Sequence, residues 1–127
     1  MNNFGRVWVM TGVVFLLVGM VFGLKMSMSM DFTLHGLHAH LNLLGFVVMT
    51  LFGLCYSQWP KMQEGVLCKV HYLIHTVSVA VAMSLLYVLL TRPELGPTIG
   101  PVMNYILMGT YAGVLLFAYL VFTRTKD

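Results

Sequence analysis

The stretch "LHAHLNLLGFVVMTLFGLCYSQW", residues Leu37–Trp59, is strongly apolar and contains no Asp, Glu, Lys or Arg. A helix needs about 20 mostly apolar residues to span the hydrocarbon core of a bilayer, so this stretch is long enough to cross a membrane. Three further segments have the same character: Val7–Leu24, Val70–Leu90 and Val102–Phe122. The sequence therefore predicts an all-α membrane protein. We expect one domain over residues 1–127, a four-helix bundle with transmembrane helices at about 7–24, 37–59, 70–90 and 102–122.

The overall composition agrees with this fold class. The chain has 127 residues, of which 59% are hydrophobic and 9% are charged, and its mean hydropathy is +0.87. These values exclude an ordinary soluble domain and leave little mass outside the membrane. The net charge of +3 comes from residues scattered in loops and tails without a basic cluster, so no nucleic-acid partner is expected.

The distribution of Lys and Arg predicts the orientation. The basic residues of one side are Arg6, Lys61, Lys69, Arg124 and Lys126, and those of the other are Lys25 and Arg92. By the positive-inside rule, both termini are expected in the cytoplasm, and the chain in the bacterial inner (cytoplasmic) membrane as a multi-pass protein. The first segment lacks a small-residue cleavage site, so we interpret it as a retained helix.

Loops and glycines complete the expected layout. The expected loops are Lys25–Gly36, Pro60–Lys69 and Thr91–Pro101, with Pro101 near the first turn of the last helix. Glycines spaced four apart occur at Gly19/Gly23 and Gly109/Gly113, a pattern that lets transmembrane helices approach closely or arises by chance. No disulfide is expected between Cys55 and Cys68, which lie near the reducing cytoplasmic face.

Five histidines are the main candidates for chemistry, because histidine inside a membrane is costly unless it is paired, hydrated or bound to a metal. His35, His38 and His40 belong to the outer end of the second helix, and His71 and His75 to the inner end of the third. At 1.5 Å per residue, His40 lies about 5 Å and His75 roughly 8 Å from their respective faces. The two sets are then about 15 Å or more apart, too far to share one iron within a subunit.

The spacing within each set differs. His38 and His40 are about 200° apart around a helix, so they are poorly placed to chelate one metal but can serve two sites on opposite flanks. The alternative is a pair of polar interfacial histidines. His71 and His75 share one helical face, which suits a metal, but the same spacing is common at interfacial helix ends and no third ligand is evident.

Methionines offer a second kind of ligand. The run "MSMSM" places thioethers at Met26, Met28 and Met30, which suit Cu(I), although methionine is frequent in this chain (11 residues) and an apolar loop cap is the alternative. Met83 and Met103 lie toward the same outer face as His40. Either is a candidate axial heme ligand, with core packing as the alternative.

A longer motif surrounds the histidine pair. The segment "HAHLNLLGFVVMTLFGLCYSQWPK", residues 38–61, resembles the tenth helix of the catalytic subunit I of heme-copper oxidases, most closely the C-family (cbb-type) enzymes. The matching features are the His-x-His of His38 and His40, the Leu-Gly-aromatic step of residues 44–46, Phe52-Gly53, Tyr56 and Pro60. The next segment, "KVHYLIHTVSVAVAMSLLY", resembles the eleventh helix. The resemblance covers about half of the chain.

The resemblance implies heme binding. In that family the first histidine of the pair ligates the active-site heme and the second ligates the low-spin heme, which implies His38 and His40 as ligands of heme iron, with heme b as the cofactor. Arg92 occupies a place comparable to the family's propionate-binding arginines. The copper histidines and the histidine-tyrosine cross-link of the family have no counterpart here. The chain on its own is therefore not expected to be an oxygen-reducing enzyme, and any enzymatic activity would be that of a heme-dependent oxidoreductase.

The family also suggests an assembly. Its catalytic subunit has twelve helices in three four-helix arcs around a pseudo-threefold axis, and this chain resembles one arc with both termini cytoplasmic. We therefore expect a homo-oligomer, with a homotrimer favoured over a dimer. In such a ring, His38 of one copy and His40 of the next would bind one heme from both sides.

Three functional interpretations follow. The first is a membrane b-type heme protein for electron transfer with a respiratory-chain redox partner. The second is a copper or heme handling protein that uses Met26, Met28, Met30 and His35. The third is a non-catalytic assembly or accessory subunit of an oxidase. Proton pumping is disfavoured in all three, since no carboxylate lies within an apolar segment.

Overall fold

The computed structural model describes residues 1–126, which form four long helices and, within that range, no β-strand. The first is α1 (Asn3–Ser29). The second consists of α2 (His35–His40), the π-helical turn η1 (Leu41–Val47) and α3 (Val48–Gln58). The third and fourth are α4 (Leu67–Thr91) and α5 (Gly96–Arg124). All four are long and apolar enough to cross a membrane, so the predicted all-α fold with four candidate membrane-spanning helices is confirmed.

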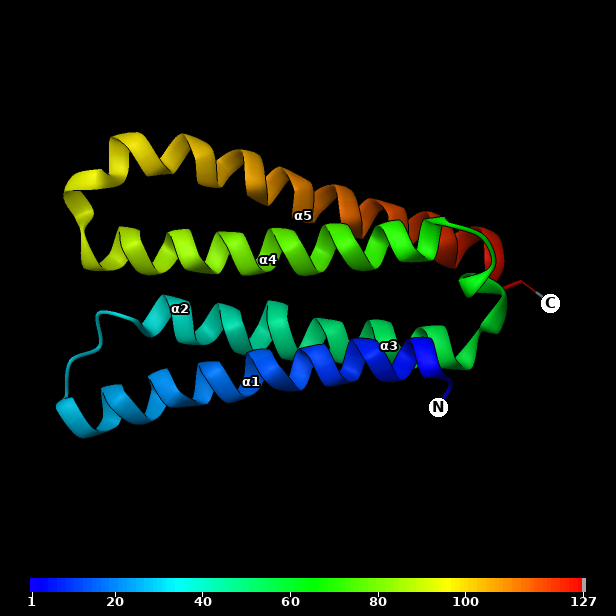
Figure 1. Cartoon of the computed structure of the whole chain (residues 1–127), viewed down its shortest axis with the longest axis horizontal. Coiled ribbons are helices and arrows are strands. Elements are labelled where there is room, and N and C mark those ends of the chain that lie inside the picture. The colour runs from blue at the N-terminus through cyan, green and yellow to red at the C-terminus, as the bar shows by residue number, and fades with distance from the viewer. Residues whose placement is uncertain (127) are drawn as a thin grey trace.

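The helices alternate in direction and follow one another in chain order in the view of Figure 1. α1 also contacts α4, since the hydroxyls of Thr11 and Tyr72 lie 2.7 Å apart. Both termini lie at one end, which we call the terminal end; the α1–α2 and α4–α5 connections lie at the opposite, distal end (Figure 1). The 3-10 turn η2 (Pro60–Gln63) precedes α4, and η3 (Pro93–Leu95) precedes α5. The cytoplasmic location of the terminal end stays a prediction.

Glycines let α1 and the second helix pack with their backbones in contact. Gly5, Gly12 and Gly19 recur every seven residues on α1, and all are buried. A Cβ atom on Gly53 of α3 would lie only 2.6 Å from the carbonyl oxygen of Gly5. On Gly23, a Cβ atom would lie 2.7 Å from Cε1 of His38. The close approach predicted for the Gly19/Gly23 pair is therefore confirmed.

The other glycine pair lies between α4 and α5. A Cβ atom on Gly109 would meet Ser78 at 3.7 Å, and one on Gly113 would meet Ile74 at 3.4 Å. These are ordinary van der Waals distances. The Gly109/Gly113 face thus packs on α4, but a Cβ atom would fit at either position.

Two apolar clusters form the core, one near each end. The terminal-end cluster consists of Trp8, Met49, Phe52, Tyr56, Met62, Cys68 and Leu120. The distal cluster consists of Met26, Leu34, Leu37, Leu41, Val79, Ala82 and Met83. Cys55 and Cys68 are both free cysteines, so the described residues contain no disulfide.

The helices are longer than the apolar segments, and the expected loop boundaries were wrong. α1 ends at Ser29, five residues beyond the expected Leu24, and the next residue, Met30, caps it with a left-handed backbone (φ 56°) and an N–H bond to the carbonyl of Met26. α5 begins at Gly96, so Pro101 lies inside that helix and not in its first turn. Helical hydrogen bonding continues past the point where the apolar run ends, because it depends on the backbone and not on hydropathy.

The glycine contact predicts a stability difference between two substitutions. Gly53→Ala should lower the free energy of unfolding by about 1–3 kcal/mol, because its methyl group would press on Gly5 and Trp8. Gly100→Ala is the control, since a Cβ atom there meets nothing within 4 Å. Unfolding midpoints measured in detergent should separate the two variants, and equal midpoints would contradict the packing described.

Candidate functional site

His38 on α2 faces α1. Its Nδ1 atom lies 2.7 Å from the carbonyl oxygen of Gly19, and its ring lies against Gly23. A carbonyl oxygen can only accept a hydrogen bond, so Nδ1 carries a proton, and in the neutral tautomer Nε2 then has the lone pair. Helix α1 therefore fixes both the tautomer and the orientation of this half-buried ring.

His40 has a different environment, although it lies only two residues away. Its side chain is exposed, and Nδ1 lies 2.6 Å from the carbonyl oxygen of Gly36 in its own helix. By the same argument Nδ1 of His40 is the donor, and Nε2 has the lone pair in the neutral tautomer. His38 and His40 thus share no hydrogen-bonding partner, which agrees with the angular divergence expected from their spacing.

A π-helical turn follows this pair directly. Segments with this wider hydrogen-bonding pattern occur frequently at functional sites. Asn42 in this turn lies against Gly19, and its Oδ1 atom is buried without a hydrogen-bond partner in the part of the chain that the structure describes. From α4, Nε2 of His75 donates to the carbonyl oxygen of Leu44 at 3.2 Å. The π-turn is therefore held from both neighbouring helices.

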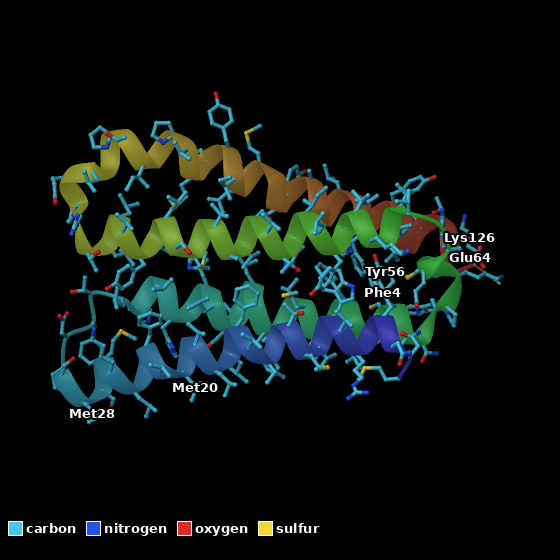
Figure 2. The ribbon with its side chains drawn as sticks, in the orientation of Figure 1. Phe4, Met20, Met28, Tyr56, Glu64 and Lys126 are labelled. Atoms are coloured by element: carbon cyan, nitrogen blue, oxygen red, sulfur yellow. The ribbon has the colours of Figure 1, made fainter. Side chains whose placement is uncertain are left out.

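His71 and His75 lie in the terminal-end core and are both completely buried. The hydroxyl of Tyr56 lies 2.8 Å from Nδ1 of His71. Figure 2 shows Tyr56 beside Phe4 at this end of the molecule; their ring centroids are 5.0 Å apart. The ring of Phe52 lies 4.7 Å from that of His71 and 5.2 Å from that of His75.

The second nitrogen of each buried histidine has no partner. Nε2 of His71, Nδ1 of His75 and Nε1 of Trp8 are buried without a hydrogen bond to the described residues. Within the same part of the chain, no group of three or more His, Cys, Asp or Glu side chains is placed to hold a metal ion. The sequence predicted the shared helical face of His71 and His75, but not that α1, α3 and α5 would enclose it with aromatic rings.

The remaining predicted site residues lie at the distal end. Met26 is buried in the distal core, whereas Met28 and Met30 are 86% and 72% exposed, and Figure 2 shows Met28 at the outer edge of α1. His35 is the exposed first residue of α2, and Arg92 is exposed directly after α4. The structure therefore separates Met26 from the other two thioethers. Of the candidate axial methionines, Met83 is buried in the distal core and Met103 is half-buried on α5.

Comparisons of the chain with protein-family models, with curated proteins and with solved structures gave no match. The resemblance to heme-copper oxidase subunit I therefore stays a hypothesis that depends on the quoted motif.

The buried Tyr56–His71 hydrogen bond predicts an effect on stability. Tyr56→Phe should lower the free energy of unfolding by about 1 kcal/mol, because it leaves Nδ1 of His71 without a partner in the core. The matched control is Tyr111→Phe on α5, whose ring is exposed, and it should have almost no effect. Equal effects of the two variants in detergent unfolding would show that the hydrogen bond does not stabilise the fold.

Proposed function

We propose that this chain is a multi-pass b-type heme protein of the bacterial cytoplasmic membrane that transfers electrons, with both termini on the cytoplasmic side. One observation carries the proposal. His38 and His40 lie at the same end of one helix in different surroundings, and each uses Nδ1 to donate to a backbone carbonyl, which leaves Nε2 as the nitrogen available to a ligand.

The donor chemistry of these histidines fits heme iron. Metal-ligating histidines usually donate their other ring N–H to a carbonyl or carboxylate, which fixes the ring and makes the ligating nitrogen more basic. Gly19 and Gly36 supply those carbonyls here. A heme held by two histidines would supply one-electron exchange between ferric and ferrous iron, and such a closed site favours electron transfer over oxygen chemistry.

The separation of the two histidines supports a shared site between copies. Within one copy His38 faces α1 and His40 is exposed, so each would contribute one ligand to a different heme. In the proposed homotrimer, His38 of one copy and His40 of the next complete each site, with one heme per protomer. Arg92 is exposed at the same distal end and would offer its guanidinium to the heme propionates.

Other residues argue against oxygen reduction and proton pumping by this chain. Counterparts of the oxidase copper histidines are missing from the sequence, and no carboxylate lies within the apolar segments to relay protons. We therefore propose electron transfer with a respiratory-chain partner. This interpretation differs from that of a copper handling protein, which would use Met26, Met28, Met30 and His35.

Absorption spectra test the heme. The purified protein should show a Soret band and, after reduction with dithionite, an α band. His40→Ala and His38→Ala should each abolish or shift these bands, because each removes one axial ligand. His35→Ala is the matched control on the same helix and should leave them unchanged. A colourless protein that binds Cu(I) would replace this proposal with metal handling, and a colourless, copper-free protein would favour the accessory subunit.

The mass of the protein in detergent tests the assembly. Native mass spectrometry should detect a trimer with one heme per protomer. In His40→Ala, heme should be lost from every site at once, because each site uses one copy of that residue. A heme-free monomer as the sole species would refute the shared site.

A further inference from the structure

Two hollows lie in succession between α1 and α4. The first, which we call the slot, has a volume of about 570 Å³ and is almost entirely apolar. Phe15, Val18 and Phe22 of α1 line one side, and Ala80, Met83 and Ser84 of α4 line the other. The second, which we call the vestibule, has a volume of about 300 Å³, and its lining is mixed. The polar part consists of Lys25, Ser29, Asp31, Thr33, Tyr87 and Thr91, and the apolar part of Met26, Leu34 and Leu90.

The slot and the vestibule adjoin each other at Tyr87. Along α1 the lining passes from Phe22 in the slot to Lys25 in the vestibule, one turn closer to the distal end. Along α4, Tyr87 lines both hollows. The rings of Phe22 and Tyr87 meet at this junction, with centroids 6.0 Å apart and planes inclined at 40°. The molecule therefore offers one site with an apolar body, an aromatic neck and a polar mouth.

The charges of the vestibule favour a neutral head group. The hydroxyl and amide of Thr33 donate to the carboxylate of Asp31 and hold the pKa of that carboxyl below its usual value. Asp31 is therefore an anion at neutral pH, and Lys25 in the same vestibule is a cation. Because the two charges offset each other, an anionic phospholipid head gains little here. The hydroxyl of Tyr87 and the ammonium of Lys25 are suited to the oxygen atoms of a neutral head.

Heme itself does not fit this site. The residues that line the slot and the vestibule include no histidine and no cysteine. Met83 lines the slot and Met26 the vestibule, but no histidine lies there to complete a site with either thioether. His38 follows the lining residue Leu37 but bonds to Gly19 on α1. The occupant of the site must therefore be a second kind of molecule.

We propose that the slot and the vestibule bind an isoprenoid quinone or quinol, with its tail in the slot and its ring at the Phe22–Tyr87 junction. The oxygen atoms of the ring then face the vestibule. A ligand of this class is neutral, aromatic at the head and apolar along the tail, as the lining requires. The binding itself needs no heme. Only the role of this quinol as redox partner of the protein depends on the proposed function.

Photolabelling tests the site directly. The protein is reconstituted into phosphatidylcholine nanodiscs and labelled with an azido-substituted short-tail quinone, with decylubiquinone as competitor. The label should map to α1 and α4 around Phe22 and Tyr87. Ala80→Phe and Ser84→Phe both fill the slot from its α4 side and should abolish labelling. Tyr87→Leu should weaken competition by about tenfold, the effect of losing one aromatic contact.

Matched controls come from α5. Ala112→Phe and Tyr105→Leu alter exposed residues that line neither hollow, and both should label as the unmodified protein does. Circular dichroism confirms that every variant is folded. Labelling that maps elsewhere, or that persists in both slot-filling variants, overturns the proposal. The proposal is also overturned if excess phosphatidylglycerol suppresses labelling as effectively as decylubiquinone does, because the site then binds lipid.

The same samples distinguish this proposal from the heme proposal. The slot-filling variants should keep the Soret band, because neither His38 nor His40, the proposed heme ligands, lines the slot. Specific labelling of a colourless protein would support the quinone site and refute the proposed heme function. A Soret band in a protein that takes no specific label would support the proposed heme function and refute the quinone site.

Discussion

Hydrocarbon offers no hydrogen-bonding partner, so helices apolar enough to cross a membrane must satisfy their polar groups within the protein. The backbone does so by remaining helical, and many hydroxyl side chains do so by bonding to the carbonyl one turn earlier, although the hydroxyls of Thr50, Ser57 and Thr76 are buried without a partner among the described residues. Examples of such bonds are Thr11 to Val7, Ser84 to Ala80 and Thr123 to Tyr119. The histidines obey the same rule, since four of them bond one ring nitrogen to a carbonyl or hydroxyl of the protein.

The second ring nitrogen distinguishes the two histidine pairs. His71 and His75 are fully buried among aromatic rings, so their unpartnered nitrogens face only protein. His38 is half-buried and His40 is exposed, so only this pair is open to a ligand that enters from outside the protomer. Burial, rather than residue type, is thus what makes one pair a candidate for metal ligation and the other a candidate for packing.

Hydropathy was sufficient to predict four helices, because each segment must by itself be apolar enough to lie in a bilayer. It could not predict where helices end, since α1 and α5 continue on backbone hydrogen bonds beyond the apolar runs. The π-turn at Leu41–Val47 has no sequence signal that we identified. The four-residue spacing of Gly19 and Gly23 did indicate a face of α1 that packs closely, but the wider series Gly5, Gly12 and Gly19 emerged only from the structure. The enclosure of His71 depends on Trp8 and Phe117, which are distant in sequence and so invisible to local patterns.

The gap between α1 and α4 is closed at one end and open at the other for a simple steric reason. At the terminal end Trp8 fills it, with its ring 4.7 Å from that of His71 and 5.0 Å from that of Tyr72. At the distal end the facing residues of α4 are the small Ala80 and Ser84, and the slot remains. Leu37 and Leu41 line this slot and flank His38 and His40 in the chain. The slot therefore lies against the helical turn that carries both histidines, although neither histidine lines it.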